Sequence, residues 1–122
     1  MEFLHKEITE QIISAAFEVY HHLGYGFLEK VYQRAMKVEL DLRGLKADLE
    51  SPIQVFYKGN NVGPYEADLF VNELVIVEIK VAKEYQSADE PQLLNELKAT
   101  GIKVGLLIDF GRTQVQFKRM VF

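Results

Sequence analysis

Three charged residues lie in and beside the most apolar stretch of the sequence. Glu78 and Lys80 interrupt the run from Leu74 to Val81, and Asp68 precedes Glu78 by ten positions. Because residues two apart on a strand point to the same face, Glu78 and Lys80 are expected side by side. A charge in an apolar interior is costly unless it is paired or bound to a metal. Two interpretations therefore remain open, an ion pair between Glu78 and Lys80 or a functional site.

Asp68 favours the functional site. Two carboxylates that converge from neighbouring strands, with a lysine beside them, form the kind of oxygen site that Mg²⁺ or Mn²⁺ prefers. A metal ion can polarise a phosphoryl oxygen and lower the pKa of a bound water, while the ammonium group orients that water or stabilises developing negative charge. The three residues therefore favour metal-assisted chemistry at a phosphoryl group.

The turn between the two carboxylate-bearing strands decides whether the carboxylates meet. A two-residue turn at Asn72 and Glu73 would place Asp68 and Glu78 on opposite faces of the sheet. A three-residue turn that also includes Leu74 shifts the register by one and brings Asp68 opposite Glu78. We therefore predict a three-residue turn, or a bulge with the same effect on register.

The elements that must position these residues follow from hydrophobic periodicity. Apolar residues at helical spacing predict three helices, at residues 4–23, 27–43 and 89–100. Period-two patterns and buried runs predict five strands, at residues 52–58, 65–71, 74–81, 104–108 and 113–122. Glycines at positions 24, 44 and 101 mark the expected helix ends.

This order, α-α-β-β-β-α-β-β, indicates an α/β protein with a mixed sheet. The strand at 74–81 should be central and parallel to the strand at 104–108, because a helix connects the two. The strand at 113–122 is more polar and is expected at an edge. With 122 residues, the chain is predicted to form one domain, 1–122.

Composition excludes several classes of protein. The chain is 48% hydrophobic and 26% charged, which is typical of a globular domain. It has no cysteine, which excludes disulfides and thiolate metal sites, and no apolar run near the roughly 20 residues that span a bilayer. The segment from Met1 to Glu7 lacks the pattern of a signal peptide. We expect a cytoplasmic protein with no membrane partner.

The net charge of -4 is unusual for a protein that binds nucleic acid. Its distribution weakens that objection, because from Leu97 onward the sequence has five basic residues and Asp109 as its only acidic one. A solvated polar face and a stripe that follows phosphates explain this asymmetry equally well.

The motif formed by Asp68 and Glu78-Ile79-Lys80 resembles that of the PD-(D/E)XK nuclease superfamily. More narrowly, the segment Gly26-Phe27-Leu28-Glu29-Lys30-Val31-Tyr32 is similar to the signature of the GxxExxY family within it. The similarity extends through further segments at 57–59, 66–68, 92–95, 97–101 and 105–111. The resemblance implies a restriction-endonuclease-like core with an α-β-β-β-α-β arrangement.

The resemblance also implies roles for the matching residues. Asp68 and Glu78 would be metal ligands together with the backbone carbonyl of Ile79. Lys80 would position the attacking water, and Glu29 would be a third carboxylate that acts on the metal or its water.

Gln92 would brace the lysine or the water, although it could equally be an ordinary helix-start residue that reaches back to Asp89. The chain departs from the family pattern at Ala67, where the superfamily name expects proline. Pro91 and Glu96 also differ, since alanine and tyrosine are common at these positions.

These observations predict a nuclease that depends on Mg²⁺ or Mn²⁺ and hydrolyses nucleic acid, with DNA favoured, by a metal-activated water. The alternative is a non-catalytic module of the same fold that binds nucleic acid or another protein, as a homodimer or as an accessory subunit. The intact set of Asp68, Glu78 and Lys80 favours the enzyme, because an inactive fold has no reason to keep a costly charge cluster.

Overall fold

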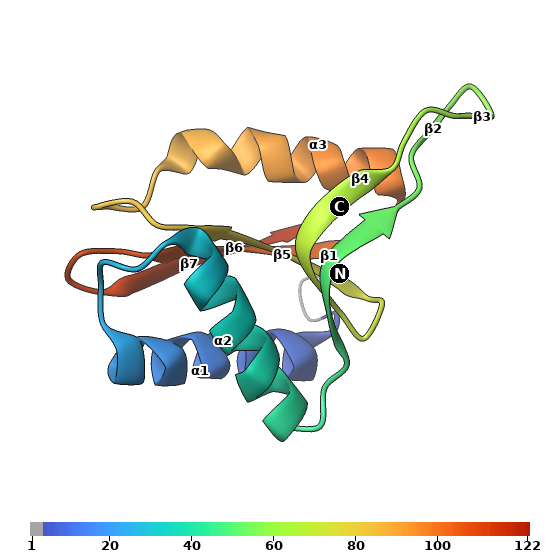
Figure 1. The fold of residues 1–122 in the computed structure, drawn as a ribbon. Helices are drawn as coiled ribbons and strands as arrows, with labels where there is room; N and C mark the ends of the chain where they lie inside the picture. Colours follow the sequence, from blue (N-terminus) through green and yellow to red (C-terminus); the bar gives the residue numbers. More distant parts are fainter. Residues whose placement is uncertain (1–3) are drawn as a thin grey trace.

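The computed structural model describes residues 4–122 as a sheet between two helical layers. Helices α1 (Lys6–Leu23) and α2 (Glu29–Leu42) cover one face, and α3 (Glu90–Thr100) covers the other (Figure 1). A short 3₁₀ helix, Ser87–Asp89, precedes α3. Residues 1–3, which belong to the segment where no signal peptide is expected, lie outside the described part. No helix within residues 4–122 combines the length and apolar content needed to cross a membrane.

The three predicted helices are confirmed, with ends shifted by one or two residues. α1 buries Ile12, Ala15 and Val19, which recur at helical spacing, and Gly24 follows its last turn with a φ of 69°. α3 has a proline in its first turn, where the missing N–H costs no hydrogen bond. Gly101 ends α3 with a φ of 77°, a conformation that glycine adopts without strain.

The main sheet has the strand order β1-β4-β5-β6-β7. Its strands are β1 (Ala47–Ile53), β4 (Tyr65–Val71), β5 (Val75–Lys80), β6 (Val104–Phe110) and β7 (Val115–Val121). As predicted, β5 is central and runs parallel to β6, whereas the other neighbouring pairs are antiparallel. β7 lies at an edge, also as predicted.

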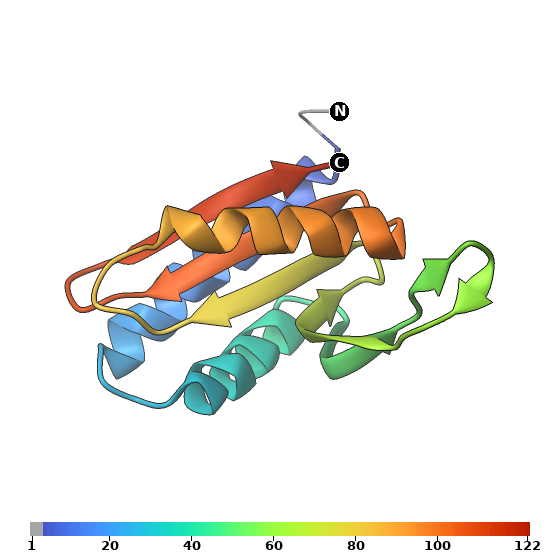
Figure 2. The same cartoon turned by 90° about the horizontal axis from the view of Figure 1, so that it is seen from above.

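The predicted strand at residues 52–58 is wrong. β1 ends at Ile53, and the chain then forms a separate hairpin of β2 (Phe56–Tyr57) and β3 (Asn60–Asn61) that projects from the body (Figure 2). β1 begins five residues earlier than expected because residues from Ala47 onward pair with β4. Because β1 contains several polar residues, its own sequence does not predict a strand. The pairing with β4 determines β1 instead.

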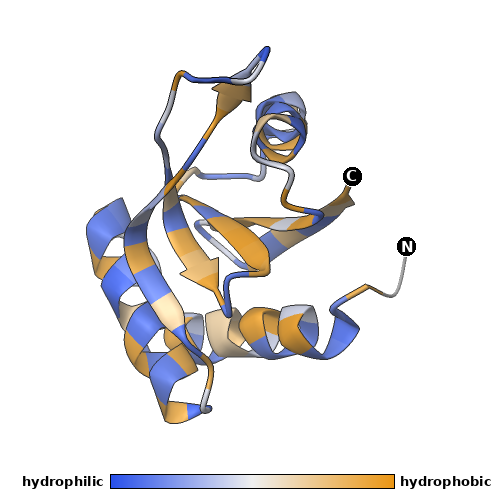
Figure 3. Ribbon diagram, turned by 90° about the vertical axis from the view of Figure 1, so that its right-hand side faces the viewer, coloured by the Kyte–Doolittle hydropathy of each residue, from blue (hydrophilic) through white to orange (hydrophobic). Residues whose placement is uncertain are grey.

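Two hydrophobic cores lie on the two faces of the sheet, and apolar residues gather along its strands (Figure 3). The core below α1 and α2 includes Val77 and Ile79 of β5. The core below α3 includes Ile76 together with Leu93 and Leu97. Since alternate residues of β5 face opposite cores, Glu78 and Lys80 point to the α3 side with Ile76.

Candidate active site

The β4–β5 turn has the register that the sequence predicts. Val71 pairs with Val75, so three residues form the turn. Asn72 supplies a left-handed conformation with a φ of 52°, and the residue after it has a φ of 56°. When the same register is continued along the strands, Asp68 lies opposite Glu78.

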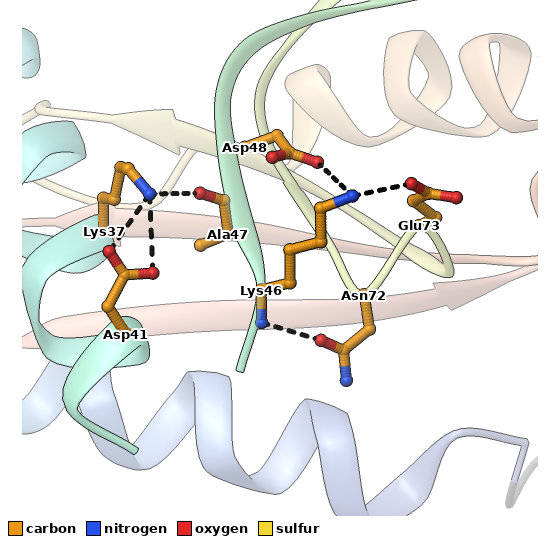
Figure 4. A network of polar contacts seen from close by, with 7 residues as sticks. All are labelled: Lys37, Asp41, Lys46, Ala47, Asp48, Asn72 and Glu73. Atoms are coloured by element: carbon orange, nitrogen blue, oxygen red, sulfur yellow. Dashed lines mark hydrogen bonds and ion pairs between the residues drawn. The ribbon is translucent and has the colours of Figure 1, made fainter. Parts of the chain in front are cut away.

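A polar network holds this turn against the start of β1 (Figure 4). The side chain of Asn72 accepts a hydrogen bond from the Lys46 backbone N–H at 2.8 Å, and the Asn72 N–H donates to the Lys46 carbonyl at 2.8 Å. The Lys46 ammonium contacts Glu73 at 2.8 Å and Asp48 at 3.8 Å. These contacts at the turn therefore fix the register that places Asp68 opposite Glu78 at the other end of the hairpin.

β4 changes faces at Asp68. Leu69 packs in the core below α1 and α2, whereas Ala67, two positions away, packs in the core below α3. On the neighbouring strand β1, Glu50 has a positive φ of 48° and would pair with Asp68 in the printed register. The neighbouring strands β1 and β4 therefore rotate together at this point, which turns the Asp68 side chain toward β5.

Asp68 is held through both its side chain and its backbone. Its Oδ2 accepts a hydrogen bond from the Ile79 N–H at 2.7 Å. Its backbone carbonyl accepts one from Nε2 of Gln33 at 2.8 Å. Gln33 is buried on α2, and the sequence analysis missed it. The available signal was a polar residue within the apolar stripe of a helix that begins with Glu29.

Glu78 occupies a partly buried position beside other carboxylates. The pKa of Glu78 is raised to about 8, and burial is the largest cause. Interactions with Asp68 and Glu96 raise this pKa as well, whereas a hydrogen bond from Tyr65 lowers it. The Asp68 and Glu78 carboxyl groups therefore interact with each other. Such a raised pKa means that the site favours positive charge, whether a proton or a metal ion.

Tyr65 is a second residue that the sequence analysis missed. Its hydroxyl group lies in a short contact with Oε1 of Glu78 and at 2.7 Å from Oε2 of Glu96 on α3. Burial and these two carboxylates raise the pKa of Tyr65 far above its ordinary range, so it stays a neutral phenol. Since a phenol has one proton, Tyr65 can donate to only one of the two carboxyl groups at a time, but its hydroxyl group lies against both and so restricts the orientation of Glu78.

Gln92 contacts this network through Glu96. Its Nε2 donates to Oε1 of Glu96 at 3.1 Å. Among the described residues, Gln92 forms no hydrogen bond to Asp89 or Lys80. Gln92 nevertheless lines, with Glu78 and Lys80, a cavity of about 10 Å³, close to the smallest volume that holds one water. The predicted role in bracing the lysine or the water stays a prediction.

Lys80 and Glu29 come from different elements and interact electrostatically. Glu29 is the first residue of α2, and its pKa is raised by partial burial and by the charge of Asp68 and lowered by the charge of Lys80. Within residues 4–122, no ion pair of 4 Å or less involves Lys80. The interpretation of Glu78 and Lys80 as a simple ion pair is therefore wrong.

The donor atoms fit a hard cation in their chemistry. Asp68 and Glu78 supply carboxylate oxygens, and the carbonyl of Ile79 follows Glu78 directly in the chain. Mg²⁺ is commonly bound by one or two carboxylates with waters at the other positions. In the described part of the chain, no group of three or more His, Cys, Asp or Glu side chains is assembled for a metal ion. The charge of Asp68 therefore acts on Glu29, but Glu29 does not form a three-residue metal-binding group with Asp68 and Glu78.

Asp109 supports the segment that follows Lys80. It is buried, its Oδ1 accepts the Ala82 N–H at 2.8 Å, and burial raises its pKa. Its Oδ2 is buried without a hydrogen-bond partner among the described residues. The sequence analysis noted the segment that contains Asp109 and assigned it no role.

Comparisons with known proteins agree with this geometry at the level of family and fold. The model of the PD-(D/E)XK nuclease superfamily matches residues 6–120. No curated protein matches the chain.

The solved structure of SSO0001 is similar in fold, with a TM-score of 0.58 and 17% sequence identity. The match covers 96% of this chain and 58% of that one, so this chain corresponds to little more than half of SSO0001. At this identity the likeness shows the fold alone, which is consistent with a restriction-endonuclease-like sheet.

Proposed function

Because the chain belongs to the PD-(D/E)XK nuclease superfamily, we propose that it is a divalent-metal-dependent nuclease that hydrolyses phosphodiester bonds, with DNA as the favoured substrate. The observation that carries the proposal is the convergence of Asp68 and Glu78 on a face shared with Lys80. The finer assignments, to the GxxExxY family and to the cytoplasm, belong to the same proposal.

The chain's own residues divide the chemistry among them. Asp68 and Glu78 would hold Mg²⁺ or Mn²⁺ with the carbonyl of Ile79, and the bound cation would polarise a phosphoryl oxygen and acidify a water. Lys80, which forms no ion pair of 4 Å or less within residues 4–122, would orient that water and stabilise the negative charge that develops on the phosphate. Glu29, at the start of α2, would act on the metal or its water as a third carboxylate.

Residues behind the ligands keep Glu78 in place. Tyr65 contacts Glu78, Glu96 contacts Tyr65, and Gln92 contacts Glu96. Hydrogen bonds of this kind to metal-binding carboxylates orient the ligands and tune their affinity. We assign Gln92 to the active site through this chain of contacts.

A non-catalytic module is the second candidate, and one observation favours it. The described residues assemble only two carboxylates, and Tyr65 contacts one of the oxygens that a metal would use. A protein of this kind would bind nucleic acid, a second copy of itself or an accessory protein without cleaving a substrate.

Two measurements test the proposal. Purified protein is assayed on branched, duplex and single-stranded DNA and on RNA with Mg²⁺, Mn²⁺ or a chelator, and we expect cleavage only with metal. Calorimetric titration with Mn²⁺ then compares the wild type with an Asp68→Ala, Glu78→Ala double variant, which should lose binding.

The matched control is an Asp48→Ala, Glu73→Ala double variant, which removes the two carboxylates that contact Lys46 at the turn of the hairpin and on the neighbouring strand β1. It removes the same negative charge but keeps both predicted ligands, so it should bind Mn²⁺ as the wild type does. Identical binding by all three proteins, or cleavage that survives chelation, would contradict the proposal.

A further inference from the structure

The β2–β3 hairpin exposes large apolar side chains outside either core. Phe56 and Tyr57 are 60% and 62% exposed, and Val62 is 61% exposed. The hairpin is a two-stranded sheet of its own that extends away from the body beside α3 (Figures 1 and 2). Single exposed apolar residues are common, but three on one short arm indicate a binding surface.

The base of this arm is well fixed. The Val62 N–H donates to the Val55 carbonyl at 2.9 Å, and the Asn61 side chain donates to that of Gln54 at 2.7 Å. The exposed rings are therefore presented on a closed hairpin and not on an open loop. A surface that is ordered before binding loses less entropy when its partner arrives.

The composition of the hairpin selects the kind of partner. Residues 54–64 contain Lys58 and no acidic residue, although the whole chain has a net charge of -4. The Lys58 ammonium lies 5.5 Å from the centre of the Tyr57 ring, and the turn carries Asn60 and Asn61. Aromatic faces beside a cation are the combination that binds single-stranded nucleic acid, because bases stack and phosphates are neutralised.

A groove connects the hairpin to the candidate active site. It has a volume of about 280 Å³ and lies between the hairpin base and α3, with Val55, Asn95 and Ala99 among its lining residues. Tyr65, Gln92 and Glu96 also line it, and these are the residues of the network behind Glu78. The groove is close to the lower limit of about 300 Å³ for ligand sites, so it suits a single planar base and not a double helix.

We propose that the β2–β3 hairpin and this groove bind an unpaired segment of the nucleic-acid substrate. Bases stack on Phe56 and Tyr57, Lys58 contacts the backbone, and a base enters the groove beside Tyr65 while the adjoining phosphate reaches Glu78 and Lys80. The inference rests on the proposed function, to which it adds a preference for single-stranded or branched substrates.

The test measures binding and chemistry separately. Binding of a fluorescein-labelled 20-nucleotide oligothymidine is followed by anisotropy in the presence of a chelator, so that no cleavage occurs. A Phe56→Ala, Tyr57→Ala double variant should bind at least about tenfold more weakly. Lys58→Ala should reduce the salt dependence by about one phosphate contact.

The control variant, Val38→Ala with Leu42→Ala, removes two exposed apolar side chains from α2 and should bind as the wild type does. Because the substituted hairpin residues are exposed, the melting temperature should stay within about 3 °C of the wild-type value. Hydrolysis of bis(4-nitrophenyl) phosphate with Mn²⁺, a diester too small to reach the hairpin, should be unchanged in the hairpin variant.

Equal oligothymidine binding by the wild type and the hairpin variant would overturn the inference, as would a wild type that binds only duplex. A hairpin variant that changes self-association but not oligothymidine binding would also overturn it and would identify the arm as a protein interface. Hydrolysis of the small diester without hairpin-dependent binding would overturn this inference but would still support the proposed function. Hairpin-dependent binding without hydrolysis of any diester would support the inference and refute the nuclease.

Discussion

At the turn end of the β4–β5 hairpin, Glu73 is exposed and contacts Lys46 at 2.8 Å, and this contact lowers the pKa of Glu73. At the other end, Glu78 is partly buried beside Asp68 and Glu96, and burial raises its pKa to about 8. The two ends of one hairpin thus place a carboxylate in different surroundings. Glu73 is paired with a lysine at the surface, and Glu78 lies among other carboxylates.

The difference separates a structural contact from a functional one. A paired surface carboxylate needs nothing further, and it contributes little to stability because water screens it. A carboxylate whose neighbours are other carboxylates is stabilised only when a cation or a proton arrives. Lys80 is on the same face but forms no ion pair there within the described residues, so the excess negative charge is left for a ligand.

The largest expected effect comes from replacing Lys80, for which Lys46 serves as the matched control. Lys80→Ala should lower the cleavage rate about a hundredfold to a thousandfold, as expected when a group that stabilises transition-state charge is lost. It should leave the melting temperature unchanged or slightly raised, because a strained charge is removed. Lys46→Ala should leave cleavage unchanged. Rates on the substrate found for the wild type check both, and full activity in Lys80→Ala would refute the assignment.

The second effect is a pH dependence of stability caused by Glu78. Its folded-state pKa of about 8 lies above the ordinary value of 4.5, so the folded protein binds the proton more tightly than the unfolded chain. The resulting stabilisation is fully present below about pH 4.5 and is lost as the pH rises through about 8. Urea unfolding from about pH 5 to pH 9 should show this decline in the wild type and a weaker decline in Glu78→Gln. Parallel curves would contradict it.

A third, smaller effect concerns Tyr65. Its hydrogen bond lowers the pKa of Glu78, so Tyr65→Phe should raise that pKa and leave more of Glu78 protonated at pH 7. Because metal ligands must be deprotonated, Mn²⁺ affinity at pH 7 should fall about tenfold and recover at higher pH. Calorimetric titration at several pH values checks this, with Tyr57→Phe as the control. A loss that is the same at every pH would indicate a purely structural role.

The smallest effect is expected at the turn. Glu73→Gln removes the contact to Lys46 but keeps the backbone contacts of Asn72 that fix the register. The melting temperature should change only slightly at low salt and not at all in 1 M salt, because the contact is fully exposed and screened. Cleavage should be unchanged. A loss of cleavage would mean that the turn charges, and not only Asn72, maintain the alignment of Asp68 with Glu78.

Local pattern was sufficient for much of the fold. The continuous apolar run predicts β5 as the central strand, and the helix before β6 predicts their parallel pairing, because such a run must be buried on both faces. Helix ends follow from Gly24 and Gly101. The three-residue turn follows from requiring one shared face for Asp68 and Glu78, and the register confirms it.

Only the tertiary structure shows β1 and the rotation of β4. The polar start of β1 has no apolar pattern of its own, and it becomes a strand because β4 supplies hydrogen-bond partners from Ala47 onward. The rotation at Asp68 depends on the neighbouring Glu50, eighteen residues earlier in the chain. Nothing within either segment alone specifies that geometry.

For the candidate site, too, some residues are predicted by the sequence and others are recognised only from the tertiary structure. Residue type and spacing were enough to predict that Asp68, Glu78 and Lys80 lie together, because strand periodicity places the last two on one face and the predicted three-residue turn adds the first. The partners that hold them, Tyr65 and Gln33, come from distant positions and are ordinary in sequence. They acquire their contacts only when α2 packs on the sheet and β4 pairs with β5, since a hydrogen bond across the fold depends on where side chains meet and not on their neighbours in the chain.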